Sequence, residues 1–457
     1  MTQKSGTGHA ARQIARLSPV RTVGRVTRIE GGALLATGFG DRARIGDRVE
    51  AHLSSGQLLT GEVIQLSSEG ALVLPEGSLE GAALGDRLRL NGPAEIAPDD
   101  SWIGRIIDPS GAPMDDRPLT KGARPRPLRA PPPPPAQRAA LGARLETGLS
   151  ALNTVLPIVK GQRVGLFAGS GVGKSSLLGS LAQNMQADVV VIAMIGERGR
   201  ELRHFVDDVL GEAGLARAVI VASTSDQSPL QRRRCAWTAM AVAEHFRDAG
   251  KSVLLLADSI TRFAEAHREI AVAAGEAPVL RGYPPSTSHL IMSLCERAGP
   301  GLIGKGTITA VFSVLVAGSD MDEPVADILR GVLDGHIVLS REIAERGRYP
   351  AIDVLRSVSR SLPAAASDAE NKSINLVRRL LGVYERNQTM ITAGLYAAGS
   401  DTEIDKAIAA WSEIDDFLGR SGKDGAQACF NRLALLLRRT KAAGQQQPGN
   451  PQRPSAA

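Results

Sequence analysis

Aromatic residues are scarce in this sequence: Phe, Trp and Tyr together make up 3% of 457 residues. Proteins that bind single-stranded nucleic acid stack its bases on aromatic side chains, so we do not expect a nucleic-acid surface of that kind. The 43% of hydrophobic residues still allows a large core, which must consist mainly of Ala, Val, Leu and Ile. The length favours two or three domains.

Cysteines are few, and long apolar runs are missing as well. Cys235, Cys295 and Cys429 lie far apart, without the spacing of a metal site or disulfide framework, so we expect a reducing compartment. No run reaches the ~18 apolar residues of a membrane span, and residues 1–20 lack the apolar segment of a signal peptide. We therefore expect a cytoplasmic protein that reaches a membrane only through a partner. The net charge of +6 fits nucleic acid or an acidic partner, but we favour Arg spread over the surface.

The N-terminal third changes character twice. Residues 1–20 are a flexible terminus or a short partner-binding helix, two interpretations that the sequence leaves open. Short alternating runs separated by glycine turns predict a small closed β-barrel over residues 21–95. Residues 96–145 follow as a bridge, in which Trp102 to Asp108 predicts one more strand, and a proline-rich linker. Its part 121–144 is basic without any acid, which we interpret as a solvated linker.

The rest of the chain divides into three further parts. Over residues 146–365, strand-like apolar runs alternate with helical patterns, which is typical of a parallel sheet covered by helices. Residues 366–440 are almost wholly helical in pattern. Residues 441–457 are of low complexity and are expected to be disordered.

The most specific local pattern is a glycine-rich loop between a short apolar strand at 163–167 and a helix. Its residues are Ala168, Gly169, Ser170, Gly171, Val172, Gly173, Lys174, Ser175 and Ser176. The glycines let successive backbone N–H groups point at phosphate oxygens, and the helix N-terminus adds partial positive charge. Lys174 is expected to contact the β- and γ-phosphates of ATP, and the Ser175 hydroxyl to bind Mg²⁺. Ala168 replaces the usual first glycine, a departure that leaves the cradle intact.

Two carboxylates follow apolar runs. Asp258 ends the run 253–257, where a carboxylate next to the loop can hold the magnesium shell. Glu197 follows the run 189–195, where a carboxylate can orient and deprotonate an attacking water. An apolar run that ends in Asp is common, and Glu197 taken alone could be a solvated loop charge. The glycine-rich loop is what favours the catalytic interpretation.

Together these residues resemble the hexameric rotary-type ATPases, and most closely the flagellum-specific ATPases of flagellar type III export. The resemblance covers about residues 20–440. The segments that carry it are GRIIDPSGAPMD (104–115), residues 145–178 around the loop, IGERGRE (195–201), TSDQSPLQRRR (224–234), VLLLADSITRFAEAHREI (253–270), RGYPPS (281–286), residues 317–341 and RYPAIDVLRSVSR (348–360).

The resemblance implies an α/β fold, with a RecA-like P-loop ATPase core between an N-terminal β-barrel and a C-terminal helical domain. It implies that Glu197 polarises water, that Asp258 is the Walker B aspartate, and that Arg198 senses the phosphate. Tyr349 takes the place of an aromatic that stacks on adenine, and Arg360 that of an arginine finger from the next subunit. From the residues alone, Tyr349 could be a packing aromatic and Arg360 a surface residue after a helix.

This chain carries both Glu197 and Arg360, whereas rotary synthases divide them between two subunit types. A ring of identical copies could therefore form a competent site at every interface, which predicts a homohexamer. The resemblance also implies regulatory and stalk proteins, export chaperones and their substrates as partners, and an indirect link to the membrane export gate. Residues 275–286 resemble the loop that faces the stalk, although Gly and Pro there also fit an ordinary exposed loop.

Other functions remain open at this point. The ATPase of a virulence-type secretion system is the nearest alternative, because the two families overlap. A catalytic ATP-synthase subunit fits the barrel and the C-terminal helices less well, and Glu197 argues against a non-enzymatic subunit. A ring-shaped RNA translocase combines a similar barrel and core. It is disfavoured by the lack of aromatics in residues 21–95, so nucleic acid is not an expected partner.

Overall fold

The computed structural model describes residues 21–279, 281–316 and 321–443. The predicted N-terminal segment 1–20 and most of the predicted tail lie outside these residues. The contacts of the chain divide it into two compact units. The first holds the described parts of 1–140, 187–315 and 321–332, and the second those of 141–186, 316–320 and 333–457. The domain boundaries expected from the sequence stay a prediction.

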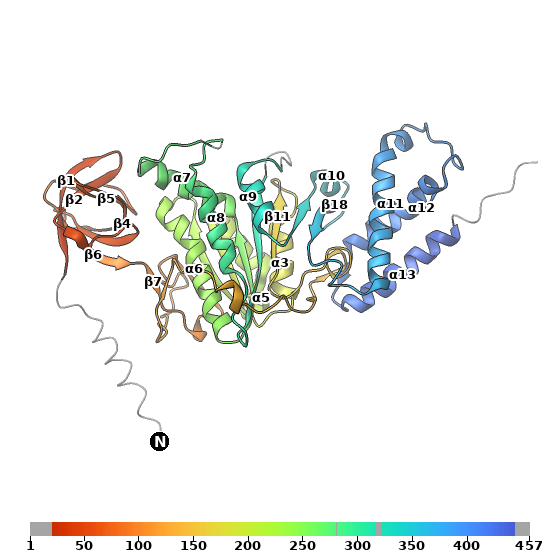
Figure 1. Ribbon diagram of the computed structural model, residues 1–457, viewed down its shortest axis with the longest axis horizontal. Coiled ribbons are helices and arrows are strands. Elements are labelled where there is room, and N and C mark those ends of the chain that lie inside the picture. Colours follow the sequence, from red (N-terminus) through yellow and green to blue (C-terminus); the bar gives the residue numbers. More distant parts are fainter. Residues whose placement is uncertain (1–20, 280, 317–320, 444–457) are drawn as a thin grey trace, which may run out of the picture. The chain divides into compact units, whose positions relative to one another are not determined.

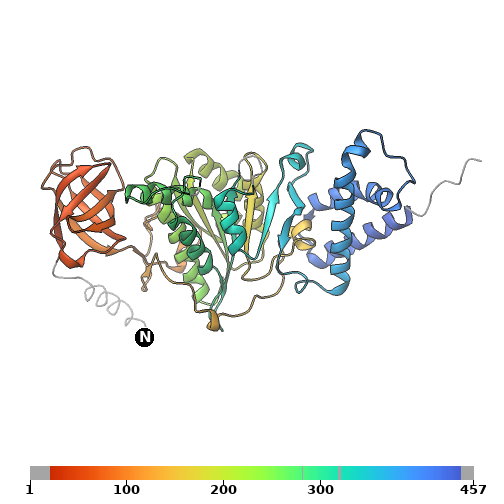
Figure 2. The ribbon, with the colours of Figure 1, turned by 45° about the horizontal axis from the view of Figure 1, so that its top comes forward.

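The first unit begins with a closed six-stranded barrel in the order β1-β2-β5-β4-β3-β6, drawn in red in Figures 1 and 2. Its strands are β1 (Val23–Glu30), β2 (Ala33–Thr37), β3 (Asp47–His52), β4 (Leu58–Ser67), β5 (Gly70–Pro75) and β6 (Arg87–Pro93), with a 3-10 turn, η1 (Gly40–Arg42). Alternate residues of the strands point inward, and Leu34, Val63 and Leu88 are among the buried core residues. The expected barrel is confirmed. Strand β3 was missed, because its sequence DRVEAH alternates small apolar residues with charges.

Several short elements connect the barrel to the parallel strands of the first unit. They are β7 (Glu95–Ile96), η2 (Asp100–Trp102), β8 (Arg105–Ile107), β9 (Arg126–Pro127) and η3 (Pro135–Gln137). The expected strand from Trp102 to Asp108 is shorter, because the buried Trp102 indole lies in η2 and donates a hydrogen bond to Thr120 O at 2.6 Å.

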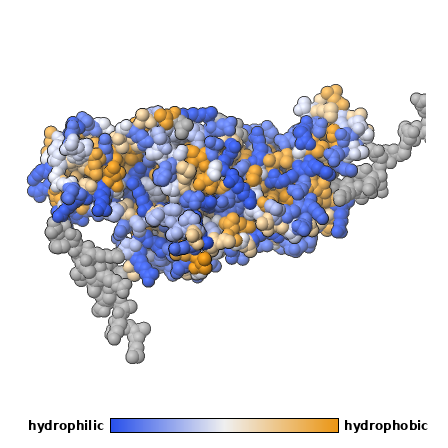
Figure 3. All heavy atoms as spheres, viewed as in Figure 1, coloured by the Kyte–Doolittle hydropathy of each residue, from blue (hydrophilic) through white to orange (hydrophobic). Residues whose placement is uncertain are grey.

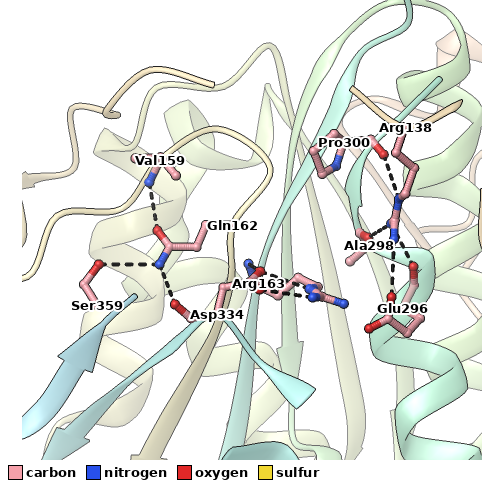
Figure 4. Close-up of polar contacts among 9 residues, drawn as sticks. All are labelled: Arg138, Val159, Gln162, Arg163, Glu296, Ala298, Pro300, Asp334 and Ser359. Atoms are coloured by element: carbon pink, nitrogen blue, oxygen red, sulfur yellow. Dashed lines mark hydrogen bonds and ion pairs between the residues drawn. The ribbon is translucent and has the colours of Figure 1, made fainter. Parts of the chain in front are cut away.

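Residues 121–144 are mostly exposed, as expected for a linker, but four of their arginines are paired with acids rather than simply solvated. Arg126 pairs with Asp248 at 2.8 Å, Arg129 with Glu62 at 2.7 Å, Arg138 with Glu296 at 3.3 Å, and Arg144 with Glu370 at 3.0 Å. Arg138 also donates to the backbone oxygens of Ala298 and Pro300, as Figure 4 shows. The arginines therefore fasten this segment to its surroundings, through acids that lie far away in the sequence.

The first unit also contains a run of parallel strands in the order β16-β14-β12-β13-β8. These are β12 (Val189–Glu197), β13 (Ala218–Thr224), β14 (Ser252–Asp258), β16 (Thr307–Leu315) and the β8 already named, with β15 (Gly299–Pro300) antiparallel to β16. The helices of this unit are α4 (Gly199–His204), the π-helical η4 (Phe205–Leu210), α5 (Gly211–Leu215), α6 (Pro229–Asp248), α7 (Ile260–Ala273), α8 (Ser286–Arg297) and α9 (Pro324–Val332). Helix α6 covers β12, β13 and β14, and α7 packs on β12 and β16.

The second unit contains β11 (Arg163–Ala168), β17 (Gly335–Leu339) and β18 (Ile352–Ser359). Strand β17 runs parallel to β11 and antiparallel to β18. Around them lie α3 (Lys174–Asn184), α10 (Arg341–Glu345), the short α2 (Ser150–Asn153), and the pair β10 (Gly148–Leu149) with β19 (Ser421–Gly422). The antiparallel β18 was not expected from the sequence, which had suggested an all-parallel arrangement.

Three helices complete the second unit: α11 (Asp368–Thr392), α12 (Thr402–Gly419) and α13 (Ala426–Ala443), drawn in blue in Figure 1. Helix α11 starts with a capping box, in which Ser367 and Glu370 satisfy each other's backbone N–H groups. The aromatic rings of Tyr384 and Trp411 stack between α11 and α12 with centroids 4.8 Å apart. The expected C-terminal helical domain is confirmed.

No helix among the described residues is both long and apolar enough to cross a membrane. On the face seen in Figure 3, hydrophobic patches are interspersed in a largely hydrophilic surface.

Candidate active site

The glycine-rich loop of the second unit joins β11 to α3. Its backbone has positive φ at Gly171 (75°) and Gly173 (87°), values that L-residues adopt only with strain. Val172 between them is buried and anchors the loop in the core. Helix α3 begins at Lys174, with Ser175 and Ser176 exposed in its first turn. The loop therefore presents backbone N–H groups and a helix N-terminus at one place, which is the geometry of a phosphate cradle.

Two neighbours of this loop bear on the sequence predictions. Ala168 is fully buried and still belongs to strand β11, so its methyl group lies in the core rather than in the cradle. The ring of Tyr349 lies against Gly173: a Cβ atom at that glycine would be 3.2 Å from the ring. Tyr349 itself is 52% exposed. The structure thus brings the expected adenine-stacking ring next to the expected phosphate loop.

Strand β11, which carries the loop, is fastened at its start. The Arg163 guanidinium makes a bidentate pair with Asp334, with Nε at 3.0 Å from Oδ2 and Nη2 at 3.1 Å from Oδ1. The Gln162 amide donates to Asp334 O at 2.9 Å and accepts from Val159 N at 3.0 Å. Gln162 also donates to the Ser359 hydroxyl at 3.5 Å (Figure 4). These bonds tie the beginnings of β11 and β17 to the end of β18.

Asp258 lies at the end of β14 in the first unit, and its side chain is buried. The Ser313 hydroxyl, from the neighbouring strand β16, donates a 2.6 Å hydrogen bond to Asp258 Oδ1. A hydroxyl bond of this kind holds a carboxylate in one orientation. Sequence reasoning missed Ser313, because the pairing of two strands 55 residues apart is not visible in a local pattern.

Glu197 lies at the end of β12, just after an irregularity in the strand. Ile195 pairs with Ser223 and Glu197 with Thr224, so Gly196 is an extra residue with φ of 66°. The N–H of this glycine donates to the Ser223 hydroxyl at 3.1 Å. Bulges of this kind redirect the following side chain and are frequent beside active sites. Strands β12 and β14 are parallel neighbours, so Glu197 and Asp258 belong to the same edge of the sheet.

Two arginines accompany Glu197. Arg198, the expected phosphate sensor, is exposed and forms a 3.6 Å pair with Glu201. Arg262 was not singled out from the sequence. Its pKa is raised, chiefly by a hydrogen bond to Glu265 and further by the negative charges of Glu265, Glu197 and Glu201. A usable signal existed, because Arg262 lies in the first turn of α7, four residues after Asp258 in the sequence.

Arg360 does not lie near the glycine-rich loop of its own chain. At the loop end of β11, Ala168 pairs with Leu339, which pairs with Ile352. The N–H of Arg360 instead donates to Asp334 O, at the opposite end of β17. At ~3.3 Å per residue, Leu339 and Asp334 are about 17 Å apart along the strand, more than twice the length of an arginine side chain. Arg360 also follows a strand, not the helix that its alternative interpretation assumed.

Comparisons with known proteins agree with this geometry. The nucleotide-binding domain of the ATP synthase alpha/beta family matches residues 148–359, and the T3SS EscN ATPase C-terminal domain matches residues 366–427. The flagellum-specific ATP synthase of Caulobacter vibrioides is 44% identical over 93% of this chain and 98% of its own length. That of Salmonella typhimurium is 42% identical over 89% of this chain and 91% of its own.

The chain belongs to the flagellum-specific ATP synthase family. Family membership makes it an ATP-hydrolysing enzyme with an ATP synthase-type nucleotide-binding core. Among solved structures, the assembled ATPase EscN from the type III secretion system of enteropathogenic E. coli matches with a TM-score of 0.84. It is 37% identical and covers 91% of this chain and 100% of its own. EscN in complex with its central stalk EscO matches with a TM-score of 0.82.

The family and the fold class expected from the sequence are therefore confirmed, as is the enzyme class. The individual roles of Lys174, Ser175, Glu197, Asp258 and Arg360 stay predictions.

Proposed function

We propose that this protein is the ATPase of a bacterial flagellar type III export apparatus, and that it hydrolyses ATP to drive the unloading and export of flagellar proteins. The names of its relatives and the match over almost their whole length support this function. In this role the protein is cytoplasmic and peripheral at the inner membrane. It works with export chaperones and their substrates, with regulatory proteins, and indirectly with the export gate.

For the bound nucleotide we assign the phosphates to the loop 168–176 and the adenine to the Tyr349 ring. The half-exposed ring against Gly173 supports this assignment. Mg²⁺ takes hard oxygen ligands and keeps several waters, so the Ser175 hydroxyl and the Asp258 carboxylate suit it, together with phosphate oxygens. Bound Mg²⁺ would neutralise charge on the β- and γ-phosphates. Lys174 contributes a further positive charge to the same phosphates.

Glu197 is the proposed general base. Its place after the Gly196 bulge, at the same strand edge as Asp258, supports this role. The carboxylate would accept a hydrogen bond from the attacking water and take its proton as the bond to the γ-phosphorus forms. Arg198, next in the chain, is exposed enough to contact a phosphate oxygen after hydrolysis.

Arg360 is the proposed arginine finger, and its location determines which nucleotide site it can reach. Because it lies at the opposite end of β17 from its own loop, it can serve only the site of another copy. The charge that develops on the γ-phosphate would then be stabilised across an interface. Head-to-tail interfaces of this kind close into rings, which fits the homohexamer expected from the sequence. We also propose a central stalk partner, as the EscN–EscO complex suggests by similarity.

Mixing two inactive variants tests this mechanism. The Glu197→Gln variant retains the arginine finger, and the Arg360→Ala variant retains the general base. Each variant alone should lose about 10²–10⁵-fold in turnover. In rings assembled from an equal mixture, about one quarter of the interfaces pair an intact base with an intact finger, so activity should return. No recovery on mixing would exclude the action of Arg360 in trans. Arg386→Ala, on the exposed face of α11, is the matched control and should keep full turnover.

The secretion system itself needs a cellular test. EscN is the ATPase of the type III secretion system of enteropathogenic E. coli, so the ATPase of a virulence-type secretion system is the second candidate function for this chain. Deleting the gene should abolish swimming if the flagellar assignment holds, and Arg386→Ala but not Glu197→Gln should restore motility. A deletion strain that swims normally but no longer secretes effectors would favour the virulence-type function.

A further inference from the structure

The barrel of the first unit packs on helices α6 and α7, and a cavity lies beside this contact. Ile64 of β4 forms a small buried cluster with Leu230 of α6 and Ile270 of α7. Next to the cluster lies a cavity of about 420 Å³, lined by residues of the barrel, the linker and helices α6, α7 and α8. This volume lies within the range of small-molecule sites. None of its lining residues belongs to the glycine-rich loop or the expected catalytic set.

One wall of the cavity is formed by arginines that share a single buried carboxylate. Arg129 Nη2 lies 2.7 Å from Glu62 Oε1, and Arg233 Nη2 lies 2.8 Å from the same oxygen. Arg234, which does not itself line this cavity, approaches the other oxygen of Glu62 at 3.7 Å and pairs with Glu76 at 2.5 Å. Three guanidinium groups thus face two carboxylates. Glu276 also lines the cavity and accepts two hydrogen bonds from Ser286, whereas Arg129 and Arg233 both pair with Glu62.

Arg233, which lines the cavity, is only partly satisfied by its hydrogen-bond partners. Its side chain is 5% exposed, and among the described residues its Nε has no hydrogen-bond acceptor. Burial, together with the charges of Arg129 and Arg234, lowers the pKa of Arg233 to about 10 in spite of the opposing charge of Glu62. A buried cation that its surroundings neutralise incompletely is stabilised by any anion that comes within hydrogen-bonding reach.

The remaining lining is suited to an apolar group. Ile270 and Ala271 of α7 and Leu290 and Leu294 of α8 contribute hydrocarbon surface. The indole of Trp237 lies beneath the cationic wall, with the Arg129 guanidinium 4.4 Å and that of Arg233 5.0 Å from its centroid. A few convergent polar groups in an otherwise apolar cavity are characteristic of sites for small organic ligands.

We propose that this cavity is a binding site for a small organic anion. Its carboxylate or phosphate group meets the guanidinium groups of Arg129 and Arg233, and its apolar body lies against α7 and α8. The site is separate from the nucleotide loop in sequence and in its residues, so the protein would hold this ligand together with ATP.

A ligand here would act beyond the cavity, because Arg233 begins a chain of hydrogen bonds. The Arg233 guanidinium donates to His267 Nδ1 at 3.4 Å, and His267 Nε2 lies 2.8 Å from the Ser286 hydroxyl. Ser286 donates to Glu276 at 2.6 Å from its hydroxyl and at 2.9 Å from its backbone N–H. An anion that draws Arg233 away from Glu62 would thus alter the attachment of the barrel and the hydrogen bonds of Ser286 and Glu276 together.

The test uses full-length protein carrying Lys174→Ala, so that the nucleotide loop does not compete for the probes. Benzoate, phenyl phosphate and the uncharged benzyl alcohol are titrated by calorimetry and by tryptophan fluorescence. We expect saturable one-to-one binding of benzoate or phenyl phosphate, with a Kd on the order of 1 mM or tighter. Benzyl alcohol should bind at least tenfold more weakly. The stronger of the two anions identifies the charged group.

Two further substitutions locate the binding. Arg129→Gln should weaken binding of the anion at least tenfold; its side chain is 46% exposed, and Glu62 keeps Arg233 and Arg234, so the variant should fold. Arg124→Gln, an exposed residue of the same linker, should leave the affinity unchanged. The proposal is overturned if neither anion saturates, or if Arg129→Gln binds as tightly as the parent protein.

Discussion

Two places in this molecule are suited to anions, and they are constructed in opposite ways. The loop of the second unit uses backbone N–H groups, made available by positive φ at Gly171 and Gly173, with Lys174 at the start of a helix. The cavity of the first unit uses side chains, above all Arg129 and Arg233, which share the carboxylate of Glu62.

The difference concerns what each arrangement contributes to the folded state. Backbone donors in a short glycine loop are positioned by local conformation, so the loop can be altered with little loss of stability. The arginine wall is part of the contact between barrel and helices, and breaking a buried ion pair leaves an uncompensated charge. We therefore expect substitutions in the loop to change nucleotide binding and rate, and substitutions in the wall to change stability first.

Glu62→Ala should have the largest effect on stability. It leaves the buried Arg233 without its carboxylate and removes the partner of Arg129, which should lower the free energy of unfolding by about 3–5 kcal/mol. Denaturant unfolding followed by circular dichroism measures the change. Glu69→Ala, in the same barrel, removes an exposed pair with Arg28 and should change it by less than about 1 kcal/mol. Similar losses in the two variants would contradict our description of the wall.

Lys174→Ala tests the other side of the comparison. Without this charge on the phosphates, turnover should fall by about 10²–10³-fold, equivalent to roughly 3–4 kcal/mol in the barrier. The melting temperature without nucleotide should stay near that of the parent protein. Lys251→Ala, at an exposed position before β14, should alter neither property. A large drop in melting temperature for Lys174→Ala would mean that the loop also supports the fold.

Gly173→Ala and Gly171→Ala separate backbone strain from the ring contact. Both place an L-residue at positive φ, at about 1–2 kcal/mol each. Only at Gly173 would the new Cβ meet the Tyr349 ring, at 3.2 Å, whereas the space at Gly171 is open. Affinity for a fluorescent ATP analogue should therefore fall about tenfold further in Gly173→Ala. Equal affinities in the two variants would contradict the proposed contact between Tyr349 and the nucleotide.

His267→Gln should give the smallest change, visible only in the pH dependence of stability. Burial, followed by the charge of Arg233, lowers the pKa of His267 to about 4. Between pH 6.5 and about 4 the unfolded chain binds a proton at this residue and the folded protein does not, so stability falls with falling pH. Glutamine cannot titrate but can still connect Arg233 to Ser286. The variant should retain about 1–2 kcal/mol that the parent loses across this window, after allowing for solvent screening. Parallel pH profiles of unfolding would show that His267 titrates normally.

Much of the fold followed from local patterns. The apolar runs 163–167, 189–195 and 253–257 agree with β11, β12 and β14, and the helical pattern of residues 366–440 agrees with α11, α12 and α13. The errors occurred where polar residues interrupt the pattern. The charged strand β3 resembled a loop, and the arginines of the linker resembled solvated charge until their acidic partners became visible.

The candidate site, like the fold, was predictable from the sequence only where its features are local. Residues of the loop can be recognised in sequence because glycine conformation and the start of a helix depend on near neighbours alone. The bond from Ser313 to Asp258 connects residues 55 positions apart, so no local pattern could indicate it. Sequence comparison suggested a finger at Arg360, but only the strand order puts that residue out of reach of its own loop.

The sequence by itself determined the phosphate loop, the strand-helix alternation around it and the family, because these depend on local backbone preferences and contiguous motifs. Tertiary structure alone decided which charges meet. The carboxylate of Glu62, the guanidinium of Arg233 and the imidazole of His267 become neighbours only when a barrel strand packs on two helices. Electrostatic interactions act through space, and burial strengthens them, so their outcome depends on packing that no short segment of the chain contains.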